Sequence, residues 1–179
     1  SSKKVSCKHC LKKKSRKTGE ITYSHQVVGS VLIHPDQKAV IPLCPEPILK
    51  EDGSTKNDCE RNAVGRWLQK FRQDHPKLSV IITEDGLSSN APHIKELYQA
   101  RCDFIVGAKP GDHKYLFELY QLAGKNVTDF SRVEGEVEHR FRYVNGLPLN
   151  ESNPDVLVNF LHYEQKNKKG TKTFTWVTS

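Results

Sequence analysis

The chain has 179 residues, of which 36% are hydrophobic and 27% are charged, which suits one domain of ordinary size with room for a smaller appendage. All of its apolar runs are far shorter than the ~18 residues that a membrane-spanning helix needs, so no membrane partner is expected. Five irregularly spaced cysteines favour a reducing compartment, the cytoplasm, over a disulfide framework.

The formal net charge of +7 has its origin in the N-terminal segment. Residues 1–17 contain eight Lys or Arg and no acidic residue, so the rest of the chain is close to neutral. Such a segment suits DNA, because each neutralised phosphate releases counterions. The alternative is a solvated, mobile arm. The residues expected to contact DNA are Lys12, Lys13, Lys14, Arg16 and Lys17.

The cysteines of this segment raise the question of a metal. Cys7 and Cys10 have the spacing of half a zinc site. No second pair with this spacing follows, and His25 is one of several residues that could complete the site. Zinc binding and chance spacing therefore both stay open. Three further cysteines are expected to be buried apolar residues: Cys44, Cys59 and Cys102.

The first predicted elements form a β-hairpin followed by a helix. Residues 21–33 alternate as a half-buried strand does, a turn follows at Pro35, and residues 39–43 return antiparallel. The stretch 56–75 then has an apolar face at helical spacing, and Pro76 ends it. That face consists of Cys59, Ala63, Val64, Trp67, Leu68 and Phe71.

A buried strand and a parallel partner come next. Residues 78–83 read as a continuous apolar strand covered on both faces, a helix is predicted from Ala91 to Arg101, and residues 103–110 form the next strand. Each crossover is one helix long, so strands 79–84 and 103–108 should run parallel. The order predicts an α/β fold with a mixed sheet.

The pattern changes after residue 110. A short helix is predicted over 114–122, followed by strands over 136–149, 156–165 and 171–179. The pair Asn145-Gly146 is a strong hairpin signal. The basic run at 166–172 is most simply a hairpin loop.

Two adjacent carboxylates, Glu84 and Asp85, follow the predicted buried strand. Neighbouring strand residues point to opposite faces, so the two are not expected to share one role. Ligands and catalytic groups of α/β sheets gather beyond the carboxyl ends of such strands, which makes Asp85 a candidate. The competing interpretation is that Asp85-Gly86 is only a turn.

Two other groups have alternative interpretations. Asp58 and Glu60 could be catalytic acids, but Asn57 followed three residues later by Glu60 is the pattern of a helix capping box, with Asp58 favoured by the helix dipole. Lys109 follows the second parallel strand and could meet a phosphate, although a lysine there is more often solvated.

The stretches HPDQKAVIPLCPEPILKEDGSTKNDCERNAVGRWL, IITEDGLSSNAPHIKEL and DFIVGAKPGDH resemble the catalytic core of DDE-type transposases of bacterial insertion sequences. More narrowly, they resemble the cut-and-paste group, whose ribonuclease H-like fold carries an inserted β-rich domain. The resemblance covers residues 20–115 by motif and the remainder by architecture. It implies a basic Cys-containing arm at 1–20, a partial ribonuclease H-like core at 21–110 and a β-rich insertion at 111–179.

This resemblance implies an enzyme that cleaves and joins DNA strands with Mg²⁺ or Mn²⁺ held by three carboxylates. The middle carboxylate falls on Asp85, whereas the first Asp and the final Glu are expected outside residues 1–179. We therefore expect a piece of a longer protein that is inactive alone. The implied partners are transposon ends and target DNA, with a homodimer assembled on DNA. The alternatives are a non-catalytic DNA-binding domain with this core and a metal-dependent nuclease.

Overall fold

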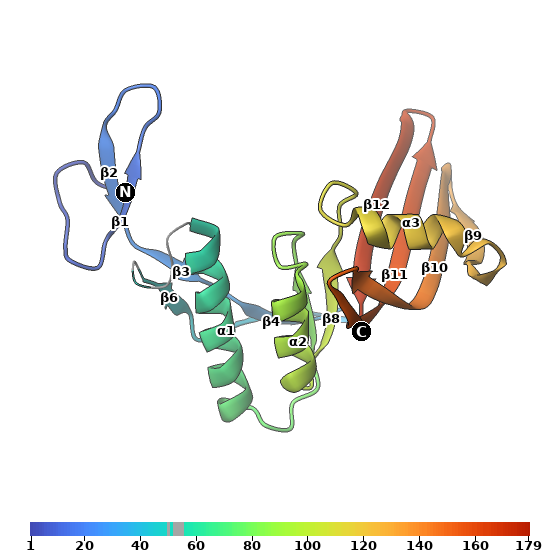
Figure 1. The fold of residues 1–179 in the computed structure, drawn as a ribbon, viewed down its shortest axis with the longest axis horizontal. Coiled ribbons are helices and arrows are strands. Elements are labelled where there is room, and N and C mark those ends of the chain that lie inside the picture. The colour runs from blue at the N-terminus through green and yellow to red at the C-terminus, as the bar shows by residue number, and fades with distance from the viewer. Residues whose placement is uncertain (50, 52–55) are drawn as a thin grey trace. The chain divides into compact units, whose positions relative to one another are not determined.

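The computed structural model describes the backbone of residues 1–49, 51 and 56–179, and the side chains of these residues except 56–59. The chain divides into two compact units, an N-terminal unit (Ser1–Pro76) and a C-terminal unit (Lys77–Ser179) (Figure 1). The described part is a mixed α/β structure in which none of the helices is long and apolar enough to cross a membrane.

The N-terminal unit consists of short antiparallel strand pairs and one long helix. β1 pairs with β2, β3 with β6, and β4 with β5. These elements are β1 (Leu11–Lys14), β2 (Ile21–Ser24), β3 (Gln26–Val28), β4 (Val31–His34), β5 (Gln37–Pro42), β6 (Glu46–Ile48) and α1 (Lys56–Asp74).

Helix α1 supplies most of the core of the N-terminal unit. Ala63, Trp67 and Phe71 recur every four residues and are buried, with Trp67 stacked on Phe71 at 5.2 Å between ring centroids. Ala63 packs against buried Ile48 of β6. The predicted helix is thus confirmed, although Cys59 and the proposed capping residues Asn57 and Asp58 have side chains outside the described residues.

The C-terminal unit contains one six-stranded mixed sheet with the order β7-β8-β12-β11-β10-β9. Figure 1 shows α3 lying across the strands of its antiparallel part. The elements are β7 (Ile81–Glu84), α2 (Ala91–Gln99), β8 (Asp103–Gly107), α3 (Lys114–Leu122), β9 (Thr128–Glu134), β10 (Val137–Asn150), β11 (Asn153–Asn167) and β12 (Gly170–Thr178).

The predicted parallel pair is present, because β7 and β8 run parallel with Ile81 opposite Asp103 and Glu84 opposite Val106. The prediction that this strand is covered on both faces is wrong. β7 lies at the edge of the sheet, and Ile81 is 60% exposed. Within its unit, α2 packs near β8 and β11 with buried Ile94 and leaves the other face of β7 open.

The predicted hairpin is confirmed only in part. β4 and β5 pair antiparallel, with Val31 opposite Pro42. The single strand expected over 21–33 is wrong, since it is interrupted at His25 and again at Gly29-Ser30, and its pieces pair with three different partners. The alternation of apolar and polar residues could not reveal these breaks, because β2, β3 and β4 are all strands.

A second correction concerns Asn145-Gly146, which is not a hairpin turn. β10 continues through it, and the register with β11 shifts between Val144 and Leu147. Gly146 has a φ of 68° and donates its backbone N–H to Asn159 Oδ1 at 3.2 Å. Gly146 therefore uses its left-handed conformation in a β-bulge and not in a hairpin turn. The chain reverses direction at residues 151–152 instead.

The expected domain boundaries do not coincide with breaks in hydrogen bonding. β1 of the expected arm pairs with β2, so residue 20 is not a structural boundary. β12 pairs antiparallel with β8, with Val177 opposite Val106. The antiparallel strands after residue 110 therefore extend the same sheet as the parallel pair.

Candidate functional site

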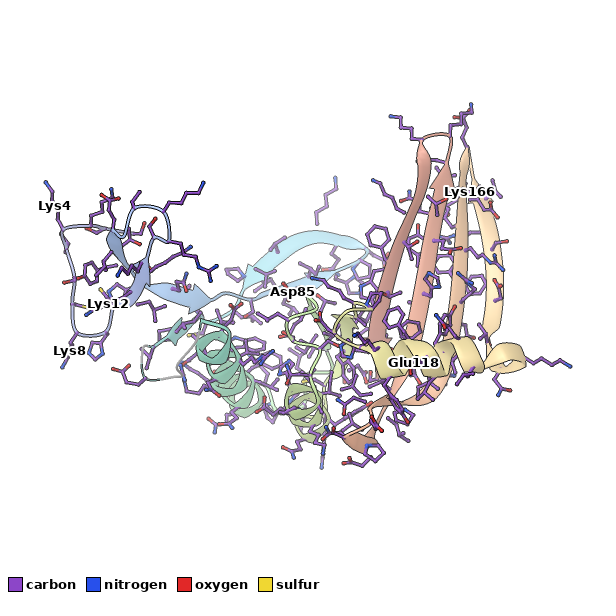
Figure 2. All side chains as sticks on the ribbon, turned by 45° about the horizontal axis from the view of Figure 1, so that its top comes forward. Lys4, Lys8, Lys12, Asp85, Glu118 and Lys166 are labelled. Carbon is purple, nitrogen blue, oxygen red and sulfur yellow. The ribbon has the colours of Figure 1, made fainter. Side chains whose placement is uncertain are left out.

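Asp85 is the first residue after β7 and lies at the carboxyl end of the parallel pair (Figure 2). Its side chain is exposed. Oδ1 accepts a hydrogen bond from the backbone N–H of Leu87 at 2.8 Å, and the Asp85 carbonyl accepts one from Ser88 at 3.2 Å. The turn interpretation is thus correct for the backbone. Among the described residues, no basic side chain forms an ion pair with this carboxylate, so Oδ2 can bind a cation.

Glu84 has different surroundings, as expected for a neighbour on the opposite face. Its Oε2 lies 2.6 Å from Nε2 of His93, a buried residue of α2, and the Glu96 carboxylate lies 3.5 Å from Nδ1 of the same ring. Burial by itself lowers the pKa of His93, but the two carboxylates outweigh burial and the pKa is raised. Glu84 therefore fastens α2 to β7.

The Glu84–His93 pair predicts a pH-dependent stability. Because the pKa of His93 is raised on folding, the pair's stabilisation is complete below the pKa of an unfolded histidine, ~6.5, and is lost as the pH rises through the folded value. Glu84→Gln should cost ~1–3 kcal/mol at low pH and weaken this pH dependence, because Glu96 still faces the His93 ring. Native-state hydrogen exchange of the β8 amides, corrected for intrinsic rates, measures both effects.

Glu118→Gln is the matched control for this measurement. Glu118 is an exposed residue of α3, labelled in Figure 2, and removing its charge should change neither the stability nor its pH dependence. A protein in which Glu84→Gln behaves as Glu118→Gln does would show that Glu84 does not hold α2.

Lys109 and two glycines shape the surroundings of Asp85. A Cβ at Gly107 would lie 3.0 Å from the backbone nitrogen of Gly86, so the ends of β7 and β8 approach as closely as glycine allows. A Cβ at Gly86 would meet Lys109 Cε at 3.4 Å. The Lys109 side chain thus runs beside the Asp85-Gly86 turn.

Two buried polar groups lie in the loops that follow β7 and β8. Ser89 Oγ and His113 Nε2 are buried and have no hydrogen-bond partner among the described residues. Burial lowers the pKa of His113, against the opposite effects of Asp112 and of a hydrogen bond with the Ser89 backbone. The His113 ring is therefore neutral near pH 7 and links the loops that follow β7 and β8.

Asp85 is one oxygen ligand and not a complete metal site. Among the described residues, the only group of three metal-binding side chains lies elsewhere, at Cys7, Cys10 and His25. Hard oxygen ligands suit Mg²⁺ or Mn²⁺, so the type of ligand fits, but one carboxylate with water holds such ions weakly. Any tight site at this edge needs further carboxylates.

The predicted zinc half-site is joined by a third residue. Cys7 Sγ and Cys10 Sγ lie 3.5 Å apart, and His25 Nε2 lies 3.4 Å from each. Backbone hydrogen bonding at His9, followed by the Cys10 side chain, lowers the pKa of Cys7 and favours its thiolate. His25 stands at the break between β2 and β3. The sequence named it as one of several candidates, and only the fold selects it.

The remaining cysteines differ from the expectation. Cys102 is buried, as predicted. Cys44 is exposed, because it lies in the link between β5 and β6 rather than on an apolar face, and that prediction is wrong.

The five predicted DNA-contacting residues lie on one hairpin. Lys12, Lys13 and Lys14 belong to β1 and are exposed, and Lys12 lies over the ring of Tyr23 at 5.8 Å from its centroid. Arg16 and Lys17 are exposed in the turn between β1 and β2. An ordered strand alternates its side chains, so these charges point to both faces of the hairpin.

Replacing these five residues by Gln is expected to weaken DNA binding by a similar factor for unrelated sequences. Each lost phosphate contact should lower the slope of log affinity against log salt by ~0.9. Fluorescence anisotropy at several salt concentrations measures both quantities.

The basic turn between β11 and β12 provides the control. Two of its lysines already have acidic partners, since Lys166 lies 3.9 Å from Glu138 and Lys168 pairs with Glu136. Replacing the lysines of this turn should therefore cost less. Binding that is unchanged by the first set of replacements would mean that the hairpin is merely solvated. The control residues are Lys166, Lys168, Lys169 and Lys172.

A row of aromatic residues crosses the C-terminal sheet and was missed by the sequence analysis. Phe130, Phe141, Tyr163 and Phe174 are directly opposite one another on four adjacent strands. The ring centroids of Phe130 and Phe141 are 4.9 Å apart, as are those of Phe141 and Tyr163. The aromatic residues are visible in the sequence, but their alignment depends on strand register.

Comparisons with known proteins add no family to this picture. A scan against protein-family models found no match, and a search of curated proteins found none.

Proposed function

We propose that this chain is the central part of a DDE-type transposase that cleaves and joins DNA strands, with Asp85 as the middle metal-binding carboxylate. The observation that carries the proposal is the exposed Asp85 carboxylate at the carboxyl end of β7, beside its parallel partner β8. In α/β sheets this edge is where ligands and catalytic groups gather.

The order of elements supports the same assignment. A hairpin, a long helix, a strand, a helix and a parallel strand precede antiparallel strands that continue the sheet. A ribonuclease H-like core with a β-rich insertion would have this order, and that finer fold is part of the proposal. A fold by itself does not establish an activity, so the proposed catalytic function depends on Asp85.

Asp85 would be this chain's ligand for Mg²⁺ or Mn²⁺, together with two carboxylates from a longer parent chain. When bound, the two ions supply an activated water or 3′-hydroxyl and stabilise the departing oxygen of a phosphodiester. Oδ1 is oriented by the Leu87 backbone, which holds the carboxylate in place. Lys109, beside the same turn, would contact a phosphate oxygen.

DNA is the proposed partner, both as transposon ends and as target. The hairpin β1–β2 offers exposed cations for phosphate contacts, which position DNA without reading its sequence. By itself the 179-residue chain should bind Mg²⁺ weakly and leave DNA uncut, because Asp85 is the only one of the three metal-binding carboxylates that the proposal assigns to it.

Strand transfer with a pre-cut DNA end tests the proposal. A longer parent chain supplied with Mg²⁺ or Mn²⁺ should join the 3′-hydroxyl of that end to a target molecule. Hydrolysis without joining would instead identify a nuclease. DNA binding with neither reaction would identify a non-catalytic DNA-binding domain.

A further inference from the structure

The N-terminal segment is ordered with almost no apolar core. Cys10 is the only buried residue in the fully described stretch 1–47. β1 and β2 have four residues each, and a two-stranded hairpin of this kind is marginally stable in water. The ion pair of Lys3 with Glu20 is exposed and contributes little. A backbone bridge between Ser2 and Tyr23 ties the start of the chain to β2, but the loop that follows it and carries Cys7 and Cys10 has little apolar support.

The one buried residue belongs to a compact group of ligand atoms. Two sulfurs and one imidazole nitrogen form a nearly equilateral triangle with sides of 3.4, 3.4 and 3.5 Å. Zn–S bonds of ~2.3 Å and Zn–N bonds of ~2.0–2.1 Å at tetrahedral angles would separate two sulfurs by ~3.8 Å and a sulfur from a nitrogen by ~3.5 Å. The observed triangle therefore matches three corners of a zinc tetrahedron.

We propose that Cys7, Cys10 and His25 bind one Zn²⁺ ion, with a water molecule as the fourth ligand. Among the described residues, no further His, Cys, Asp or Glu reaches the group. The triangle lines an open depression with Ser6 and Ser24, which leaves room for that water.

The ligand types favour zinc over the ions proposed for Asp85. Thiolate and imidazole ligands suit Zn²⁺, whereas Mg²⁺ and Mn²⁺ prefer oxygen. A disulfide is the competing use of a Cys-x-x-Cys pair, but the sulfurs are well beyond the ~2.05 Å of an S–S bond. The site lies wholly within the N-terminal unit and holds zinc whether or not the chain is a transposase.

Zinc also accounts for the local fold. The Cys7–Cys10 turn, closed by a hydrogen bond from Cys10 N–H to the Cys7 carbonyl at 3.2 Å, immediately precedes β1. His25 immediately follows β2 and separates it from β3, which begins at the next residue. One ion would thus join both ends of the β1–β2 hairpin and fix the strand that carries Lys12, Lys13 and Lys14.

The test uses the 179-residue chain, reduced, stripped of metal by a chelator and then exposed to zinc. We expect one zinc ion per chain by elemental analysis after gel filtration. Cobalt as a probe should give the thiolate charge-transfer bands and intense visible bands of a tetrahedral site. Failure of the reduced chain to bind either metal would overturn the proposal.

Two ligand variants and two matched controls locate the site. Cys7→Ser and His25→Gln should lower zinc affinity by ~100-fold or more, and Cys7 is exposed, so its loss leaves no cavity. Cys44→Ser and His34→Gln change exposed residues of the same unit and should bind zinc as the unmodified chain does.

A folding readout separates a lost site from a lost fold. Helix α1 has its own buried contacts, so the helical circular dichroism of Cys7→Ser and His25→Gln should stay unchanged. Limited proteolysis within residues 1–25 should become faster in these variants and in the metal-free chain. Unchanged zinc binding in either ligand variant, with α1 intact, would refute the assignment.

Discussion

Asp85→Asn is expected to lower DNA strand cleavage by a longer parent chain ~100-fold or more, with folding unchanged. The neutral amide cannot replace the negative charge that helps to hold two cations, and losing several kcal/mol of charge stabilisation has an effect of this size. Asn keeps an oxygen that can accept the Leu87 N–H and tolerates the same turn. Single-turnover cleavage and thermal unfolding of the same variant measure both expectations.

Asp112→Asn is the control for this experiment. Asp112 is an exposed acid in the loop after β8, so its replacement removes the same charge from the same edge of the sheet. It should leave cleavage near normal. If Asp85→Asn is stable and cleaves DNA as the control does, Asp85 is only a turn residue and the chain loses its catalytic assignment.

Phe160→Ala is expected to cost ~3–5 kcal/mol of unfolding free energy in the C-terminal unit. Phe160 of β11 is fully buried, and its ring centroid lies 4.9 Å from that of Phe117, edge-on, and 4.7 Å from that of Tyr120, tilted. Both partners belong to α3. Removing the ring leaves a cavity between helix and sheet that neither can close. Fluorine NMR of fluorotryptophan-labelled protein in urea measures this, because Trp176 reports on this unit and Trp67 on the other.

Phe130→Ala makes the same chemical change on the opposite face of the same sheet. Phe130 is 51% exposed and stacks on Phe141, so we expect a cost of ~0.5–1.5 kcal/mol. Equal costs for the two variants would mean that α3 does not form the core of this unit.

Much of the local structure follows from the sequence. The apolar residues of α1 recur at helical spacing, and those with described side chains are buried except Val64, which is half-buried. Helix α3 has the predicted bounds. β7 and β8 are parallel because one helix-length crossover separates them, which placed Asp85 at the carboxyl end of a strand. Opposite roles for Glu84 and Asp85 followed from the two-residue period of a strand.

The errors share a different origin. The stretch 21–33 has the alternation of one strand but is divided among three pairings, and Asn145-Gly146 has a turn's residues but forms a bulge. β9 was not predicted at all, although it completes the aromatic row on the C-terminal sheet. In each case the local pattern was compatible with two structures.

For this protein, the sequence alone determined where the helices α1, α2 and α3 lie, where the positive charge lies and which carboxylate follows a parallel strand. These are properties of neighbouring residues, governed by period, propensity and crossover length. Tertiary structure decided that His25, and no other histidine, joins Cys7 and Cys10, and that Glu84 pairs with His93. Those contacts join residues far apart along the chain, so their distances depend on strand register and packing, which no local pattern encodes.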